Sequence, residues 1–328
     1  MTYFSILDLS LITEGGEVAQ ALHNTRDLAQ HAEDWGYRRF WIAEHHNMPG
    51  IASAATAVVI SHVASGTSTI RVGSGGVMLP NHAPLIIAEQ FGTLEALYPG
   101  RIDLGIGRAP GTDQMTAYAL RRTLAGDVDE FPRDVQELQN YFRSPQLGQA
   151  VRAVPGAGLN VPIWILGSSL YGAQLAAAFG LPYAFASHFA PAALMQAIDV
   201  YQRRFQPSEQ LSKPYVMLGF NVFAAETDEE AQYLKSSAQQ SILNSRRGRP
   251  SRLPPPVDDF ESQLSLPERE LLNAAHTCSV TGSPETVRKG LDAFIAQTEA
   301  DEIMISSHIF DHRKRLRSFQ FVAEMAIV

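Results

Sequence analysis

Cysteine is almost absent from this chain, because Cys278 is the only one among 328 residues. A single cysteine excludes an intramolecular disulfide and any metal site built on paired cysteines, and this usage is typical of a reducing cytoplasm. A free cysteine usually behaves as a small buried hydrophobic residue. We therefore interpret Cys278 as a packing residue rather than a nucleophile.

Positive charge is also scarce. The chain carries 26 Lys and Arg against 34 Asp and Glu, a net charge of −8, whereas a nucleic-acid-binding surface needs clustered basic residues. No apolar run approaches the ~18 residues of a membrane span. Residues 1–10 also lack the basic and apolar regions of a signal peptide. We expect a soluble, cytoplasmic protein with no nucleic-acid and no membrane partner.

Short apolar runs alternate with amphipathic helical patterns along the chain. This alternation predicts parallel βαβ units. Eight such units suit a single closed (β/α)₈ domain over residues 1–328, a TIM barrel, and a doubly wound open sheet is the alternative. The eight predicted strands are residues 4–9, 39–43, 70–77, 101–107, 162–166, 182–186, 215–224 and 302–306.

Two connections are longer than a barrel normally needs. Residues 109–162 form an insertion after the fourth strand, and residues 246–281 form another after the seventh. The second insertion is rich in proline, serine and arginine. Long irregular connections in compact domains are commonly functional. We therefore interpret residues 246–281 as a mobile lid.

The third predicted strand contains an unusual number of glycines, with Gly73, Gly75 and Gly76 close together. Glycine weakens a strand, since it loses much backbone entropy and has no side chain to pack. Such a run indicates a site where a planar group approaches the backbone closely. A simple bulge is the alternative.

The fifth predicted strand ends in Gly167-Ser168-Ser169-Leu170-Tyr171-Gly172. Small residues leading into a helix N-terminus favour anion binding, because the free amides and the helix dipole point at the ligand. Arg108, at the end of the fourth strand, could supply a countercharge. An ordinary N-cap is the alternative interpretation of the two serines.

Two histidines, His45 and His46, follow Glu44 at the end of the second strand. A zinc site would join them with His82 or His188. However, adjacent strand residues point to opposite faces, so one ion cannot easily take both, and the HEXXH spacing is missing. We expect no metal here, a proton-handling or substrate-orienting role for His45, and a packed His46.

Several motifs together resemble one family, the bacterial-luciferase-like, flavin-dependent monooxygenases. The resemblance is dense over residues 36–111, recognisable over 162–190 and weaker over 279–305. The motifs that carry it are Trp41-Ile42-Ala43-Glu44-His45-His46, residues 72–84, Tyr98-Pro99-Gly100-Arg101, Leu104-Gly105-Ile106-Gly107-Arg108 and Gly180-Leu181-Pro182.

This resemblance implies a monooxygenase that uses reduced flavin and O₂ to oxidise a small organic substrate. The flavin would be FMN, or F420 in some branches, reduced by a separate flavin reductase, and the protein would be a homodimer. His45 matches the catalytic histidine, and the Gly75–Gly76 bond is a candidate cis peptide. We place the cofactor contacts at Ser74, Gly75, Gly76, Gly107, Arg108, Gly167, Ser168, Ser169, Leu170, Tyr171, Gly172 and His188.

Two departures and three alternatives accompany this prediction. The sixth strand ends in Ser187-His188, where the resemblance would lead us to expect an aromatic side chain. The luciferase subunit has a reactive cysteine where this chain has Gly107, so we do not expect light emission. An F420-dependent dehydrogenase of the same fold is the nearest alternative function. A metal-dependent barrel hydrolase and a flavin-binding protein without turnover are alternatives of other classes.

Overall fold

Eight parallel strands close into a barrel in the structure, a computed structural model that describes residues 2–109, 113–121 and 130–326. Strands β1 to β6 pair in sequence order, β6 pairs with β7, β7 with β9, and β9 with β1. The (β/α)₈ fold predicted from the sequence is therefore confirmed. The barrel strands are β1 (Tyr3–Asp8), β2 (Arg39–Ile42), β3 (Arg71–Met78), β4 (Ile102–Gly107), β5 (Ile163–Gly167), β6 (Tyr183–Phe185), β7 (Val216–Ala224) and β9 (Glu302–Ser306).

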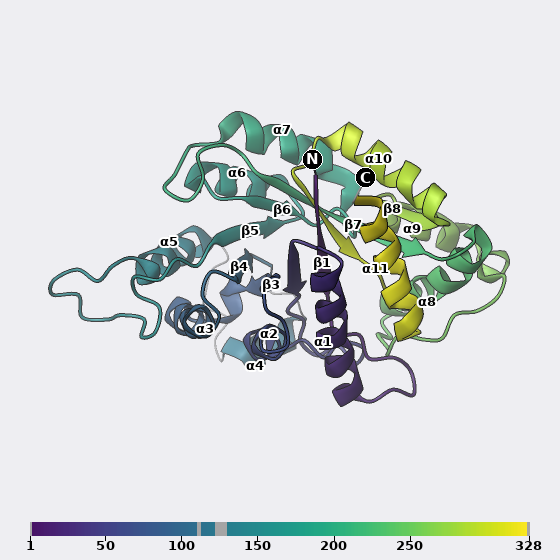
Figure 1. The fold of residues 1–328 in the computed structure, drawn as a ribbon, viewed down its shortest axis with the longest axis horizontal. Helices are drawn as coiled ribbons and strands as arrows, with labels where there is room; N and C mark the ends of the chain where they lie inside the picture. Colours follow the sequence, from purple (N-terminus) through teal and green to yellow (C-terminus); the bar gives the residue numbers. More distant parts are fainter. Residues whose placement is uncertain (1, 110–112, 122–129, 327–328) are drawn as a thin grey trace.

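Helices surround the strands (Figure 1). None of the helices within the described ranges combines the length and the apolar composition that crossing a membrane requires. The helices are α1 (Val18–Asp34), α2 (Thr56–Ala64), α3 (Pro84–Leu97), α4 (Gln114–Arg121), α5 (Phe131–Phe142), α6 (Leu170–Phe179), α7 (Leu194–Arg204), α8 (Asp228–Arg246), α9 (Leu266–Ala275), α10 (Pro284–Thr298) and α11 (His312–Ala326).

The insertion after β7 is more regular than predicted. It contains α9 and a ninth strand, β8 (Ser279–Gly282), which pairs with the second half of β7 outside the barrel. A capping box between Ser265 and Glu268 starts α9, because the two residues satisfy each other's free backbone amides. The expectation of an irregular segment was wrong for these residues, and the mobility of residues 246–281 stays a prediction.

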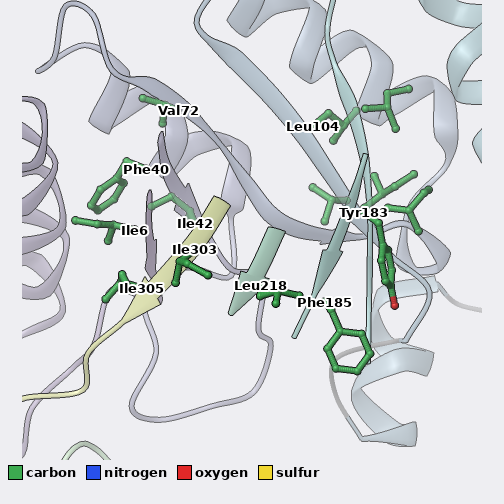
Figure 2. Packing of buried hydrophobic residues seen from close by; sticks show 14 of the residues in the cluster. Ile6, Phe40, Ile42, Val72, Leu104, Tyr183, Phe185, Leu218, Ile303 and Ile305 are labelled. Atoms are coloured by element: carbon green, nitrogen blue, oxygen red, sulfur yellow. The ribbon is translucent and has the colours of Figure 1, made fainter. Parts of the chain in front are cut away.

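Side chains along each barrel strand alternate between two apolar layers. Ile6 and Phe40 are completely buried in the layer between strands and helices, which Figure 2 shows from close by. Their neighbours Leu7 and Trp41 point the other way and pack inside the barrel. Burying one such side chain contributes about 1.5–3 kcal/mol. The alternation therefore gives one strand sequence two packed faces.

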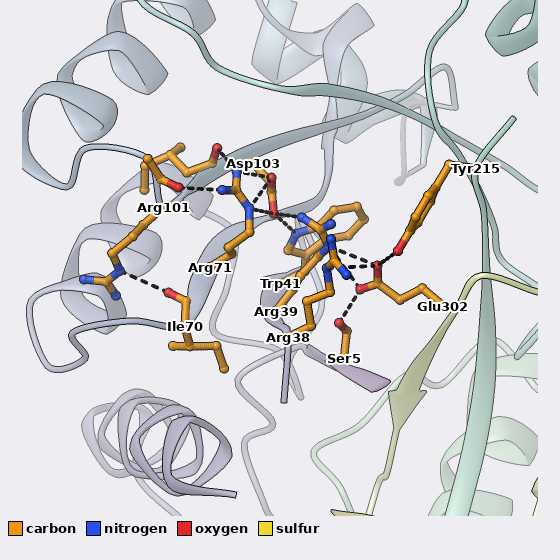
Figure 3. A network of polar contacts seen from close by, with 12 residues as sticks. Ser5, Arg38, Arg39, Trp41, Ile70, Arg71, Arg101, Asp103, Tyr215 and Glu302 are labelled. Atoms are coloured by element: carbon orange, nitrogen blue, oxygen red, sulfur yellow. Dashed lines mark hydrogen bonds and ion pairs between the residues drawn. The ribbon is translucent and has the colours of Figure 1, made fainter. Parts of the chain in front are cut away.

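A network of buried ion pairs fills the barrel at the N-terminal ends of the strands (Figure 3). Asp103 of β4 accepts hydrogen bonds from Arg39 Nη1 at 2.7 Å, Arg71 Nη2 at 2.6 Å and Trp41 Nε1 at 3.3 Å. Both oxygens of this fully buried carboxylate are therefore used. We call this group of side chains the floor network: Ser5, Arg39, Arg71, Asp103, Tyr215 and Glu302.

Glu302 completes the floor network on the opposite side of the barrel. It accepts hydrogen bonds from Arg39 Nε at 3.0 Å, from Tyr215 Oη at 2.8 Å and from the Ser5 hydroxyl. Burial alone would lower the pKa of Arg39. The negative charges of Asp103 and Glu302 have the larger effect and raise this pKa above its ordinary value. Each charged side chain of the floor network therefore pairs with a side chain of opposite charge.

Candidate active site

Gly75 and Gly76 lie in the C-terminal half of β3. The Gly75–Gly76 peptide bond is cis, which confirms the prediction, and the pairing with β4 shifts register between Gly75 and Val77. A Cβ on Gly75 would lie 2.6 Å from Leu7 Cδ1, and one on Gly76 would lie 2.8 Å from the Gly105 oxygen. Close packing inside the barrel therefore requires both glycines. Contact with a flat ring stays a prediction.

Two other predicted cofactor residues lie beside these glycines. Ser74 is completely buried, and its hydroxyl donates to the Gly105 oxygen at 2.8 Å. Its side chain is therefore committed to β4, so a cofactor contact could come only from its backbone. Gly107 ends β4 beside Met78, whose sulfur would lie 3.1 Å from an added Cβ.

Glu44 fastens the end of β2 to the end of β3. Its backbone amide donates to the Gly76 oxygen at 3.4 Å, and its carboxylate accepts from the Met78 amide at 3.1 Å. The ring nitrogens His46 Nε2 and His82 Nε2 lie 2.8 and 2.9 Å from Glu44 Oε1. Burial alone would raise the pKa of Glu44, but these hydrogen bonds hold it below its usual range.

The same three side chains could hold a metal ion. Donor atoms of Glu44, His46 and His82 all lie within 4.8 Å of one another, and two imidazoles with one carboxylate form a donor set that zinc accepts. The spacings of 2.8 and 2.9 Å are those of hydrogen bonds. His45 is not part of this set, in line with the alternation expected of adjacent strand residues.

The predicted anion loop and its countercharge come together. The Arg108 guanidinium lies over the Tyr171 ring, 4.0 Å from its centroid, at the first turn of α6. Ser169 is the N-cap of α6, and its side chain makes no capping hydrogen bond. Ser169 therefore does not cap the first amides of α6, and Arg108 lies beside the first turn of this helix.

Gly167 and Gly172 pack against each other and against Tyr183 in this loop. A Cβ on Gly167 would lie 3.4 Å from the Gly172 Cα and from Tyr183 Oη. Tyr183 Oη also donates to the Ser169 oxygen at 3.1 Å, which fixes the turn between β5 and α6. Ser168 and Leu170 lie in the same turn, so all six predicted loop residues are neighbours.

Histidines gather at the C-terminal ends of the strands, which we call the barrel mouth. Besides His46 and His82, His45 follows β2, His188 follows β6 and His308 follows β9, and His276, which precedes β8, lies near His308. Burial, with His308 and His45 nearby, lowers the pKa of His188 to about 4. Burial and positive neighbours likewise lower the pKa of His308 and of His276 to about 4. These three imidazoles are therefore neutral at pH 7.

Sequence reasoning identified His45 and His188 but missed His276, His308 and Gly219. The signal for His308 was present, because it follows the last strand just as His188 follows the sixth. The signal for Gly219 was a glycine inside the buried strand β7, where a Cβ would overlap His188 Nδ1. His276 had no signal, because β8 was not predicted.

Part of the predicted lid covers the barrel mouth. The Leu253 amide donates to the Ile12 oxygen at 2.9 Å, and the Glu14 amide donates to the Leu253 oxygen at 2.8 Å. Arg252 Nη1 also donates to the Gly16 oxygen at 2.7 Å. A cavity of about 110 Å³ lies beside Leu253 and is lined by Leu9, Leu11, Met48, Pro49, Gly50, Ile51, Ser241, Ser245, Pro250, Ser251, Leu253 and His308.

A larger hollow of about 690 Å³ opens elsewhere, between α5 and α6. Gln136 and Asn140 line it on the α5 side, and Ala178 lines it on the α6 side. None of the predicted site residues lines this hollow. The chemistry-bearing side chains identify the barrel mouth as the candidate active site. Cys278 takes no part as a nucleophile, since it is buried and burial raises its pKa to about 11.

The fold and the polar strand ends define a barrel enzyme, because such barrels carry their active sites at the C-terminal face. Residues 2–302 match the family described as luciferase-like monooxygenases, and the chain belongs to this family. A luciferase-like monooxygenase of Escherichia coli strain K12 is 52% identical over 98% of this chain and 96% of its own length. The N-acetyl-S-alkylcysteine monooxygenase of Bacillus subtilis is 40% identical over 71% of this chain and 70% of its own.

Solved structures agree with the fold. The apo-MsnO8 crystal structure is 34% identical and superposes with a TM-score of 0.88 over 100% of this chain and 99% of the other. The oxygenating constituent of 3,6-diketocamphane monooxygenase of Pseudomonas putida, in complex with FMN, is 18% identical with a TM-score of 0.73, covering 98% of this chain and 97% of the other. The F420-dependent tetrahydromethanopterin reductase of Methanopyrus kandleri is 15% identical with a TM-score of 0.68, covering 99% and 98%. The last two show the fold alone.

Proposed function

We propose that this protein is the oxygenase component of a flavin-dependent monooxygenase, which takes reduced FMN from a separate reductase and oxidises a small organic substrate with O₂. The observation that carries the proposal is the Arg108 guanidinium over Tyr171 at the start of α6. Helix amides that Ser169 does not cap, next to a fixed cation, suit a phosphate. The FMN complex of the diketocamphane enzyme supports the choice of cofactor.

The residues present fit such a cofactor. Arg108 and the first turn of α6 would hold the phosphate, and the backbone of Gly75 and Gly76 lies at the end of the adjacent strand β3. When bound, reduced FMN supplies the electrons with which O₂ oxidises the substrate. Glu44 positions the β3 end through the Gly76 oxygen and the Met78 amide.

The other side chains of the barrel mouth would handle protons and exclude water. We assign to His45 the transfer of a proton at its imidazole, because it lies at a strand end close enough to His188 and His308 to affect their charge. The segment around Leu253 covers this end of the barrel and would keep the reacting groups dry. We also propose a homodimer, which sedimentation of the purified protein would test.

The experiment that tests the function compares FMN with riboflavin, which lacks the phosphate. Under anaerobic reduction, the wild-type protein should bind FMN at least about tenfold more tightly, as expected of a charged hydrogen-bonded contact. Arg108→Met should bring the affinity for FMN down to that for riboflavin. The control Arg203→Met removes an exposed arginine of α7 and should change neither. Equal affinity of the wild-type protein for both ligands would contradict the proposal.

The alternatives have their own readouts. F420 in the same titration distinguishes a dehydrogenase, which the fold of the Methanopyrus reductase keeps open. Metal analysis of the purified protein tests the hydrolase, which would use Glu44, His46 and His82. Oxygen consumption with reduced FMN separates an oxygenase from a protein that only binds flavin.

A further inference from the structure

We propose that the cavity beside Leu253 binds an uncharged aliphatic group of the substrate, about four carbon atoms long. We call this cavity of about 110 Å³ the mouth pocket. The inference names a substrate class for the barrel mouth and therefore rests on the proposed function. It follows from the side chains that line the mouth pocket, from its volume, from the contacts between its walls and from its place beside the candidate site.

Hydrocarbon forms most of the wall of the mouth pocket. Leu9, Leu11 and Leu253 line it, and Met48, Ile51 and two prolines complete the apolar part. Among the described residues that line it, none carries a carboxylate, an ammonium or a guanidinium group. A charged group buried there would lose its water without gaining a partner of opposite charge, whereas an apolar group gains free energy when it leaves water. The mouth pocket therefore favours an uncharged, apolar group.

The volume of the mouth pocket limits the length of this group. An apolar cavity of about 150 Å³ holds one benzene molecule. The mouth pocket, with about 110 Å³, has about three quarters of that volume. It therefore has room for about four carbon atoms.

Main-chain contacts hold three walls of the mouth pocket together. The Ile12 amide donates to the Gly50 oxygen at 2.9 Å, which joins the segment after β1 to the segment after β2. The Leu253 amide donates to the Ile12 oxygen at 2.9 Å. Gly50 also lies against the backbone of the third segment, because a Cβ on it would lie 2.6 Å from the Ser251 oxygen. The walls are therefore fixed without a ligand, so the limit on length should be sharp.

The mouth pocket lies next to the residues of the candidate site. Leu9 packs on the apolar cluster inside the barrel that contains Leu7, and Leu7 lies beside Gly75. His308 also lines the mouth pocket, and it is close enough to His45 for each charge to affect the other. A substrate whose aliphatic end fills the mouth pocket would therefore have its remaining part near His45 and the end of β3.

The test measures how linear primary alcohols, from ethanol to octanol, bind to the full-length protein. Methyl-labelled leucine and isoleucine side chains report each titration by NMR at pH 7. Each added methylene should tighten binding about fourfold as far as butanol, and longer chains should gain little more. Affinity that keeps rising at this rate through octanol would overturn the proposal, because it would indicate an open surface. The absence of saturable binding would overturn it as well.

A second comparison tests the preference for an uncharged group. Butanol should bind at least about tenfold more tightly than butanoate and than butylammonium, because the mouth pocket offers neither ion a partner. Equal affinities for butanol and for one of the two ions would overturn the proposal.

Variants then locate the binding site. Ser241→Leu puts a larger hydrocarbon group on the α8 wall of the mouth pocket and should weaken butanol binding at least about tenfold. The control Gln232→Leu, at an exposed position of the same helix, should leave binding unchanged. Leu11→Ala removes about three carbon atoms from the wall after β1 and should move the length limit from butanol towards heptanol.

The two variants can each refute the proposal. Unchanged butanol binding in Ser241→Leu would mean that the alcohol lies elsewhere. A limit that stays at butanol in Leu11→Ala would mean the same, and this variant decides the matter if Ser241→Leu does not fold. If FMN shows no phosphate preference while the length limit persists, the proposed function fails and the mouth pocket stands. A phosphate preference without a length limit would leave the proposed function and refute the mouth pocket.

Discussion

The two ends of the barrel hold their buried polar groups in opposite ways. At the N-terminal end, Asp103 and Glu302 of the floor network accept hydrogen bonds from Arg39, and each has further donors. At the C-terminal end, His188 and His308 keep buried nitrogens without partners. A saturated network can serve only the fold, whereas unsatisfied groups are free to take a ligand. This difference indicates that the floor network stabilises the fold and that the barrel mouth is available for function, as expected for this barrel architecture.

Neutralising one floor carboxylate should give the largest effect. Asp103→Ala leaves Arg39, which is 6% exposed, without one of its two carboxylates. Breaking a buried pair by removing one partner costs about 3–5 kcal/mol, because the remaining charge stays buried. Urea unfolding of the purified protein would measure this loss of free energy.

A matched surface pair provides the control for Asp103. Asp199 pairs with Arg203 at 2.7 Å on α7, where both side chains are exposed. Asp199→Ala should cost at most about 0.5 kcal/mol. Equal losses of unfolding free energy in the two alanine variants would contradict the claim that the floor network stabilises the fold.

The packing of His188 on Gly219 offers the next largest effect. Gly219→Ala places a methyl group where the ring lies, and overpacking of this kind costs about 1–3 kcal/mol. In a His188→Ala background the added methyl group has room, so the cost should largely disappear. A double-mutant cycle by urea unfolding measures this coupling, and independent effects of the two substitutions would contradict it.

The comparison also shows what the sequence can predict. Strand order and strand ends follow from local patterns, so the barrel and the meeting of Arg108 with the Gly167–Gly172 loop were predicted correctly, whereas the roles of His45 and of the loop stay predictions. Residues of the floor network were visible as charges at strand starts. Their pairing was not, because Arg39 reaches partners 64 and 263 residues away. Such contacts depend on closing the barrel and leave no local signal.

The segment predicted to be a lid shows a second limit of prediction from the sequence. Composition correctly marked residues 246–281 as unusual, and the structure places Leu253 on the loop after β1. Composition could not show that contact, since it joins backbone groups of Leu253 to those of Ile12 and Glu14. The capping box at Ser265 and Glu268, by contrast, is a local motif. It could have predicted α9 from the sequence.

The smallest predicted effect concerns pH and separates the mouth from the floor. The pKa of His188 is about 4 in the folded protein and about 6.5 in an unfolded chain. Between these values the unfolded state binds a proton that the native state lacks, so stability falls as the pH decreases through this range. From pH 7 to pH 5.5, His188 should cost about 1 kcal/mol of unfolding free energy. Below pH 4 both states are protonated and the loss levels off.

Proton uptake on unfolding measures this contribution directly. Near pH 5.2, calorimetry in buffers of different ionisation enthalpy should show about one proton fewer for His188→Gln than for the wild-type protein. The control Phe189→Leu alters a neighbouring ring, 5.3 Å from His188 between centroids, without removing a titratable group, so its uptake should equal that of the wild type. Equal uptake in all three proteins would mean that the His188 imidazole already titrates normally in the folded protein. The barrel mouth would then be as well satisfied as the floor, and the contrast between the two ends would fail.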